Sequence, residues 1–150
     1  MTVTVKLEDP KSEDASGILK ESHILMQAMF SPDENHFLSI DELCGENVLF
    51  FVGRVDGEPA GTGALMIKDG YGEVKSMFTK SDYRGLGVAD TILSKIEDEA
   101  KARSLPYLRL ETGDLLHAAM RLYSRFGFHD CGPFGDYEDN GASVFLEKSL

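Results

Sequence analysis

The sequence predicts one domain of the α/β (α+β) class over residues 1–150, with a mixed central sheet of about six to seven strands flanked by about four helices. Three observations support this prediction. A chain of this length can bury one core without disulfides or a structural metal. Short β-rich apolar runs are distributed over both halves of the chain. Two of these runs enclose a helical segment, and such a strand–helix–strand unit usually pairs its strands in parallel.

The N-terminal region combines one strand with two helices. Residues 3–7 alternate apolar and polar side chains, which indicates a strand. Ser31-Pro32-Asp33 ends the helix that follows, and a short second helix is expected over residues 40–43. The buried face of the first helix is predicted from four residues at helical spacing, namely Ile18, Ser22, Leu25 and Met29.

An antiparallel meander is predicted in the middle of the chain. Residues 48–52 form a continuous apolar run, and Asp56-Gly57 separates it from a second run over residues 60–67. An Asp-Gly pair between two such runs is a strong hairpin signal. A second turn at residues 68–70 leads into a third strand over residues 71–79.

The second half contains the strand–helix–strand unit. After the strand 71–79, apolar residues recur at helical spacing over residues 87–102, and a further strand is expected over residues 107–111. Terminal strands are expected over residues 128–131 and 143–148. A last helix is predicted over about residues 115–126 from an apolar stripe that consists of Leu115, Ala119, Leu122 and Phe126.

The chain is strongly acidic. It contains 15 Lys and Arg against 26 Asp and Glu, and its formal net charge is −11 at pH 7. Such a charge disfavours nucleic acids and anionic membranes as partners, because both are polyanions. The same charge attracts a cationic substrate. An anionic ligand therefore needs local hydrogen-bond donors that offset the unfavourable field.

The two cysteines and the N-terminal sequence indicate in which cellular compartment the protein is expected. Cys44 and Cys131 fit either one disulfide or two free thiols, and no Cys-x-x-Cys spacing or Cys/His cluster indicates a metal site. No basic N-terminal stretch precedes an apolar run, and no run approaches the ~18 apolar residues of a membrane span. We therefore expect a cytoplasmic protein with reduced thiols and no metal.

A glycine-rich loop opens the helix 87–102, with the sequence Arg84-Gly85-Leu86-Gly87-Val88-Ala89. The first N–H groups of a helix lack intrahelical partners, and the helix dipole adds partial positive charge there. Glycines remove the Cβ atoms that would keep a ligand away from the backbone. Such a loop can hold a phosphate, and Arg84 can add charge-assisted hydrogen bonds. The alternative is a tight turn with a solvated arginine. The spacing matches neither a Walker A loop nor a three-glycine Rossmann fingerprint.

Two segments resemble the signature motifs of the GNAT superfamily of N-acetyltransferases. Within residues 72–89, Arg84, Gly87 and Ala89 match the fixed positions of the acetyl-CoA motif, Q/R-x-x-G-x-G/A. The run 119–128 resembles the second hallmark, Ala-x-x-Leu-Tyr-x-x-x-Gly-Phe. Both motifs stand in the family's order with a strand between them, so the resemblance implies the GNAT fold and acetyl-CoA as cosubstrate.

The resemblance also implies a cofactor site. In the family, the strand before the loop presents backbone groups to the acetyl carbonyl and the pantetheine, and the loop amides hold the pyrophosphate. The matching residues here are Met77, Phe78 and Thr79 on the strand and Arg84, Gly85, Leu86, Gly87, Val88 and Ala89 in the loop. The family's motif tyrosine lies near the cofactor sulfur, and Tyr123 matches it. Leu116 stands where many members have an Asn or Gln that contacts the cofactor.

Acetyl transfer requires a neutral amine, a polarised thioester carbonyl and a protonated leaving thiolate. The backbone N–H of Met77 can polarise the carbonyl, and Tyr123 can act as the general acid. Glu73 and Glu111 are candidates for the general base, and Glu73 ranks first because its strand also carries Met77. The alternatives are a core aromatic for Tyr123 and solvated or ion-paired carboxylates for the two glutamates.

The segment that follows Cys131 resembles one branch of small bacterial GNAT proteins, which suggests a role in the acceptor pocket. Asp136, Glu138 and Asp139 can attract an ammonium group. The alternative is a Gly/Pro turn around one buried aromatic. The residues predicted for the substrate side of the site are Glu111, Phe134, Asp136 and Tyr137.

We therefore predict an acetyl-CoA-dependent N-acetyltransferase that moves an acetyl group to a primary amine by direct attack in a ternary complex. No cysteine lies in an activated-nucleophile motif, which disfavours a covalent acetyl-enzyme. The alternative is a non-catalytic acyl-CoA-binding sensor or interaction module, and a second is a transferase of longer acyl chains. The expected acceptor is a small-molecule or peptide amine, and the resemblance leaves a homodimer open.

Overall fold

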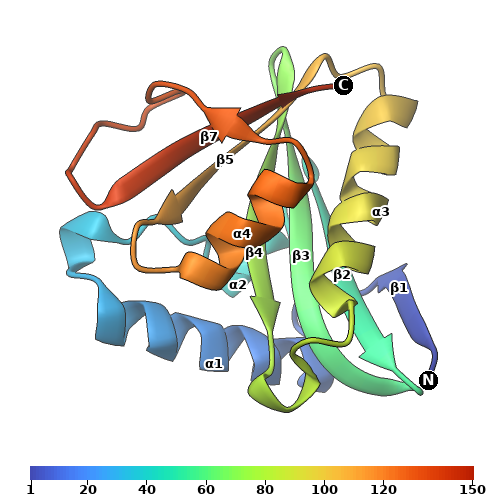
Figure 1. Cartoon of the computed structure of the whole chain (residues 1–150). Helices are drawn as coiled ribbons and strands as arrows, with labels where there is room; N and C mark the ends of the chain where they lie inside the picture. Colours follow the sequence, from blue (N-terminus) through green and yellow to red (C-terminus); the bar gives the residue numbers. More distant parts are fainter.

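Seven strands form one mixed sheet in the order β1-β2-β3-β4-β5-β7-β6 (Figure 1). The computed structural model describes all residues 1–150. The strands are β1 (Val3–Leu7), β2 (Val48–Val55), β3 (Glu58–Lys68), β4 (Tyr71–Thr79), β5 (Tyr107–Gly113), β6 (His129–Asp130) and β7 (Ser143–Ser149). The helices are α1 (Glu13–Met29), α2 (Ile40–Leu43), α3 (Val88–Ala102) and α4 (His117–Arg125). The predicted fold class is confirmed.

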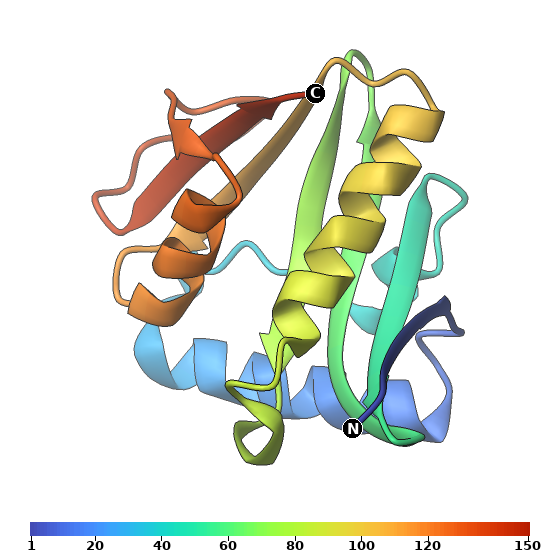
Figure 2. The ribbon, with the colours of Figure 1, turned by 45° about the vertical axis from the view of Figure 1, so that its right-hand side comes forward.

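All neighbouring strands pair antiparallel except β4 and β5, which are parallel as predicted. These two strands pair only at Gly72 with Leu108 and at Glu73 with Arg109. Beyond this point they separate toward their C-terminal ends (Figure 2). The register of β4 against β3 also shifts between Thr62 and Ala64, opposite Ser76, whose φ of +56° marks a β-bulge. The edge of β4 that follows the bulge is therefore unpaired on the β5 side.

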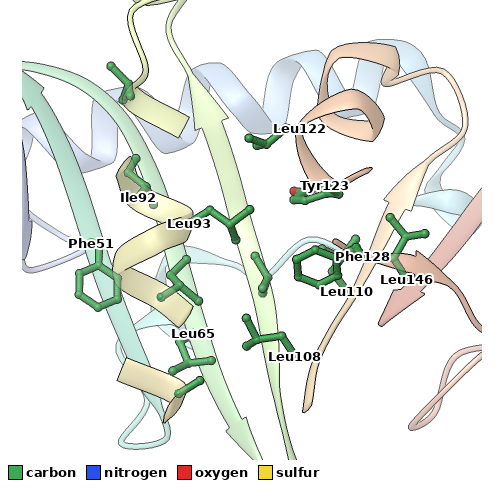
Figure 3. Packing of buried hydrophobic residues seen from close by; sticks show 14 of the residues in the cluster. Phe51, Leu65, Ile92, Leu93, Leu108, Leu110, Leu122, Tyr123, Phe128 and Leu146 are labelled. Carbon is green, nitrogen blue, oxygen red and sulfur yellow. The ribbon is translucent and has the colours of Figure 1, made fainter. Parts of the chain in front are cut away.

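Helices cover both faces of the sheet (Figures 1 and 2). α1 and α2 pack on one face, where Leu19 and Leu43 meet Phe50. α3 and α4 lie on the other, where Phe51 packs with Ile92 and Leu93. Phe50 and Phe51 point to opposite faces because successive residues of a strand alternate. The larger of the two cores lies on the α3 side, and Tyr123 is at its edge (Figure 3).

Glycines on β2 and β3 let α3 approach the sheet closely. A Cβ atom on Gly53 would lie 2.9 Å from Cδ1 of Ile92, and one on Gly61 would lie 3.1 Å from Cγ1 of Val88. Neither position has room for a side chain without a shift of its neighbours. This packing fixes the N-terminus of α3 beside the end of β4, where the glycine-rich loop connects them.

The last helix begins later than the sequence pattern suggests. α4 starts at His117, so Leu115 lies in the preceding turn with 52% of its surface exposed and does not belong to the buried stripe. Leu116, the residue at the N-cap, makes no side-chain cap hydrogen bond. A leucine cannot accept one, and the turn closes instead through the Leu116 N–H, which donates to the Gly113 carbonyl.

Both cysteines are free thiols, Cys44 exposed and Cys131 half-buried. No helix combines the length and the apolar composition that crossing a lipid bilayer requires. No group of three or more His, Cys, Asp or Glu side chains is arranged to hold a metal ion.

Candidate active site

The loop between β4 and α3 presents a row of unpaired backbone N–H groups. The first helical hydrogen bond runs from the Thr91 N–H to the Gly87 carbonyl at 3.0 Å, and the N–H groups of residues 85–90 have no partner in the protein. Gly85 and Gly87 have φ of +77° and +86°. A Cβ atom on either would meet no atom within 4 Å, so the space before the backbone is open. This arrangement fits a diphosphate at a helix N-terminus.

Arg84 lies at the start of this loop, and its side chain is exposed. Its Nε donates to the carbonyl oxygen of Thr79 at 3.3 Å, which ties the loop to the end of β4. The other guanidinium nitrogens make no hydrogen bond within the protein and can meet an anion at the loop.

Replacing Gly87 with alanine should weaken acetyl-CoA binding several-fold, because the new Cβ atom enters the open space before the N–H groups. The positive φ adds a cost of about 1–2 kcal/mol to folding. Gly70 is a matched control, since it has a φ of +84° and equally open surroundings but lies in the β3–β4 turn. Calorimetric titration with acetyl-CoA would measure both variants. Equal loss of affinity in both would contradict a ligand contact at Gly87.

The unpaired edge of β4 follows the bulge at Ser76. The N–H of Lys80 donates to the Ala60 carbonyl at 2.8 Å, so it points toward β3. Because N–H groups alternate in direction along a strand, those of Met77 and Thr79 point away from β3, toward the side where β5 has separated. The hydroxyl of Thr62 donates to the Ser76 carbonyl at 2.8 Å and holds the bulge in place. Two strand N–H groups are therefore free to bind a ligand.

A cavity of about 120 Å³ lies beside this edge. Its walls come from β4, β5, the end of α1, the segment 34–37 and the start of α4. The lining residues on which the chemistry depends are Lys75, Ser76, Met77, Glu111, Leu116 and Tyr123. The structure thus brings together the predicted strand residue Met77 with Tyr123 and Glu111.

Tyr123 extends from α4 to the cavity. It is 5% exposed, and its ring packs against Phe128 with the ring centroids 5.7 Å apart. Burial, and then the Glu111 carboxylate, raise the pKa of the phenol above its ordinary value. The hydroxyl therefore keeps its proton at neutral and moderately alkaline pH, as a general acid must.

Glu111 and Glu73, the two candidate bases, lie in different surroundings. Glu111 lines the cavity, and its Oε2 accepts a hydrogen bond from the Ser143 hydroxyl at 2.7 Å. Glu73 is 3% exposed and does not line the cavity. Its Oε2 accepts a 2.5 Å hydrogen bond from the Tyr137 hydroxyl and lies 3.4 Å from Nζ of Lys75. The geometry favours Glu111 over Glu73 as the carboxylate that a substrate can reach.

Tyr137 is the centre of a buried polar network. Its hydroxyl donates to Glu73 and accepts from Nζ of Lys75 at 2.8 Å, and the same Nζ donates to the His36 carbonyl at 2.9 Å. The network joins β4 to the segment after α1 and to the segment after β6. Lys75 is the residue that the sequence analysis missed, although a lysine two positions from a glutamate in an apolar strand hints at a buried pair.

The predicted acceptor residues of the C-terminal segment lie outside the cavity. Phe134 is 8% exposed and packs edge-on against Tyr71, Tyr137 and Phe145. Asp136 is exposed. None of Phe134, Asp136 and Tyr137 lines the cavity, because the network and the aromatic cluster turn this segment toward β4 and β7. The segment supports the cavity wall from behind.

Replacing Tyr137 with phenylalanine should lower the free energy of unfolding by about 1–3 kcal/mol, since Glu73 and Lys75 each lose a buried hydrogen-bond partner. Urea unfolding at neutral pH would measure the loss. Tyr107→Phe is the control, because Tyr107 lies at the start of β5 beside Arg109 and away from the network. A variant as stable as the parent would show that the network contributes nothing to the fold.

The same variant should change the pH dependence of stability. Burial, and then the hydrogen bond to Glu73, raise the pKa of Tyr137 above its ordinary value. The unfolded chain releases this proton near pH ~10 while the folded chain retains it, so alkali favours the unfolded state. The parent should lose stability above pH ~10 more steeply than Tyr137→Phe does. Parallel stability curves for the two proteins would contradict the raised pKa.

The comparison with known families decides what this site belongs to. The model of the acetyltransferase (GNAT) family matches residues 18–128, which include the glycine-rich loop and Tyr123. The chain is a GNAT acetyltransferase. The N-acetyltransferases of this family take their acetyl group from acetyl-CoA, and the unpaired N–H groups of residues 85–90 fit that ligand's diphosphate.

Relatives of this acetyltransferase match along nearly the whole chain. An IAA acetyltransferase of Azospirillum brasilense is 37% identical over 99% of this chain and 98% of its own length. An uncharacterised N-acetyltransferase, YsnE of Bacillus subtilis (strain 168), is 36% identical over 97% of this chain and 99% of its own length. These full-length matches support an N-acetyltransferase rather than a non-catalytic module.

Solved structures of related proteins share the fold. A candidate acyl-CoA N-acyltransferase of Klebsiella pneumoniae superposes with a TM-score of 0.83 at 27% identity, over 99% of this chain and 98% of that chain. The PaiA N-acetyltransferase of Thermoplasma acidophilum, solved with coenzyme A, has a TM-score of 0.79 at 18% identity and covers both chains in full. At that lower identity the likeness concerns the fold alone.

Proposed function

We propose that this GNAT acetyltransferase transfers the acetyl group of acetyl-CoA to a primary amine by direct attack in a ternary complex. One observation carries the proposal. A single cavity is lined by Met77, at the unpaired edge of β4, by the phenol of Tyr123 and by the carboxylate of Glu111. The reaction needs a donor to the carbonyl oxygen, an acid and a base, and these three groups can supply them.

The cosubstrate has a matching surface that leads to this cavity. The N–H groups of residues 85–90, with Arg84, would hold the diphosphate, and the free N–H groups of Met77 and Thr79 would bind the pantetheine and acetyl end. When bound, acetyl-CoA supplies an activated acyl group on a sulfur leaving group. Phe78 lies between the two ligand-facing N–H groups, and its own N–H points toward β3 by the same alternation.

Each proton has an acceptor or a donor in the cavity. The amine nitrogen attacks the carbonyl carbon, the carbon–sulfur bond breaks, and the amine proton passes to Glu111 directly or through water. Tyr123 gives its phenolic proton to the departing sulfur and regains one from solvent. The Met77 N–H donates to the carbonyl oxygen as negative charge grows on it.

Neither cysteine supports a covalent route. Cys131 does not line the cavity, and burial, followed by Glu147, raises the pKa of its thiol above the ordinary value. A raised pKa keeps the sulfur protonated and a poor nucleophile. Cys44 follows α2 and lies outside the cavity lining. Direct attack by the amine therefore agrees with the residues that are present.

Two measurements test the proposal. A thermal shift with acetyl-CoA reports binding, and release of the CoA thiol in the presence of an amine library reports turnover. Initial rates with both substrates varied should give intersecting double-reciprocal lines, as a ternary complex requires. Parallel lines would indicate an acetyl-enzyme instead. A thermal shift without turnover of any amine would favour the acyl-CoA-binding module.

A further inference from the structure

We infer that the acceptor is a small primary amine with an apolar body and no carboxylate beside the amine. The inference rests on the proposed function and concerns the same cavity. Its basis is the charge of the lining, where the one ammonium or guanidinium group, Lys75, is already neutralised within the protein.

Lys75 is held by three groups of the protein, one of which balances its charge. Its Nζ donates to the His36 carbonyl at 2.9 Å and to the Tyr137 hydroxyl at 2.8 Å, and it lies 3.4 Å from Oε2 of Glu73. Two of its three N–H bonds are used in these hydrogen bonds, and the Glu73 carboxylate balances its charge. The side chains of Lys75 and Glu73 are only 9% and 4% exposed, so the pair is shielded from solvent. A carboxylate in the cavity would therefore meet an ammonium group whose charge is already balanced by Glu73.

The other lining groups do not replace it. Nε2 of His36 lies 3.4 Å from Nδ2 of Asn140, whose Oδ1 accepts from the N–H groups of Ala142 and Ser143 and so fixes the amide orientation. This contact directs Nε2 of His36 at the Asn140 amide, away from a ligand in the cavity. The Ser76 hydroxyl is buried without a partner, but it offers a single neutral donor.

Two carboxylates give the cavity a negative character that suits an ammonium. Glu111 keeps one oxygen free, because only its Oε2 accepts from Ser143. Glu34 likewise accepts through Oε1 from the N–H and hydroxyl of Ser31, which leaves Oε2 free. Both residues line the cavity. The amine can therefore arrive as an ammonium, pair with these oxygens and lose its proton to Glu111.

The rest of the lining is apolar and the space is small. Met26, Phe30, Phe37 and Leu116 form apolar walls. The volume of about 120 Å³ is close to the ~150 Å³ of an engineered apolar cavity that binds benzene. The cavity accepts a compact apolar group next to the amine and provides no unpaired ammonium or guanidinium group for a carboxylate.

The test uses two matched series of acceptors: 2-phenylethylamine, phenylalaninamide and phenylalanine, and isoamylamine, leucinamide and leucine. Values of kcat/KM are compared after correction for the fraction of neutral amine. Within a series, the amino acid should fall about tenfold or more below the other two, because its carboxylate would lie near Glu111 and Glu34 with no unpaired cation to balance it. An amino acid as good as its amine would overturn the inference. So would an amide as poor as the acid, because size and not charge would then exclude both.

Two variants test the role assigned to Lys75. In Glu73→Gln the ammonium loses its counter-charge, so the preference for the amine over the amino acid should narrow several-fold. In the double variant Glu73→Gln/Lys75→Met both charges are gone, and the preference should return to the parental value. If Glu73→Gln folds and keeps the full preference, the argument from Lys75 fails. If it does not fold, loss of the preference in the double variant overturns the inference.

The inference and the proposed function fail in different ways. Turnover of amines outside both series, with none inside them, would refute a small apolar acceptor and leave the transferase intact. No thiol release with any amine in the library, despite binding of acetyl-CoA, would refute the proposed function itself.

Discussion

Replacing Tyr123 with phenylalanine should lower kcat by about a hundredfold or more, the contribution expected of a general acid, while the Kd of acetyl-CoA stays near the parental value. The ring is retained, so its packing against Phe128 in the core persists. Only the proton that the departing sulfur needs is lost. Pre-steady-state thiol release and calorimetric titration would separate the chemical step from binding.

The loss should be uniform from neutral to alkaline pH. Burial and the Glu111 carboxylate hold the pKa of Tyr123 above its ordinary value, so the parent phenol does not ionise in that range and gives no alkaline limb of its own. Tyr107→Phe, which removes a phenol far from the cavity, should keep the parental kcat. A Tyr123→Phe enzyme within about twofold of the parent would leave Tyr123 as a core aromatic and require another acid, such as water.

Local patterns were sufficient to predict most of the fold. Asp56-Gly57 between two apolar runs specified the β2–β3 hairpin, because few residues other than these accept the positive φ that the turn requires, +48° and +88° here. The apolar periodicity of residues 88–102 specified α3 and, with it, the parallel pairing of β4 and β5. The start of α4 was the exception. No capping residue marks it, so the periodicity alone extended the helix back over Leu115.

The site was harder to predict because its decisive contacts join distant parts of the chain. The contact between Lys75 and Tyr137 spans 62 residues, and that between Glu111 and Ser143 spans 32. No local sequence pattern predicts which carboxylate, Glu73 on β4 or Glu111 on β5, will be buried by a hydrogen bond to a residue far along the chain. Glu73 and Glu111 look alike in the sequence, and only the position of Tyr137 separates them. The glycine-rich loop was predictable, since a helix N-terminus and its free N–H groups are local features.

The bulge at Ser76 had no signal of its own in the sequence. A serine at φ +56° in a strand is strained, and nothing in Val74-Lys75-Ser76-Met77 marks it. Yet this residue lies where β4 and β5 separate, and the unpaired edge that follows it offers N–H groups to a ligand. The feature that opens the site is therefore a property of the assembled sheet.

Replacing Glu111 with glutamine should lower kcat/KM by about a hundredfold or more and should flatten the acid limb of its pH profile. A base must be deprotonated to act, so activity that depends on Glu111 falls as the pH is lowered. Glutamine keeps the size of the side chain and can still accept from Ser143, but it cannot take the amine proton. Rates at saturating acetyl-CoA over the acidic and neutral range would measure the change.

Glu147→Gln is the matched control for this variant. Glu147 lies on β7 opposite Arg109, two residues along the ladder from the pair of Glu111 with Phe145, and it does not line the cavity. Its replacement removes a strand carboxylate and an ion pair with Arg109, and it should leave the acid limb in place.

Glu73→Gln distinguishes between the two candidate bases. Since Glu73 is held by Tyr137 behind the cavity wall, its loss should preserve the acid limb for a preferred amine. A limb that flattens in Glu73→Gln and persists in Glu111→Gln would reverse the assignment of the base, because the proton would then leave through Tyr137 and not at the cavity surface.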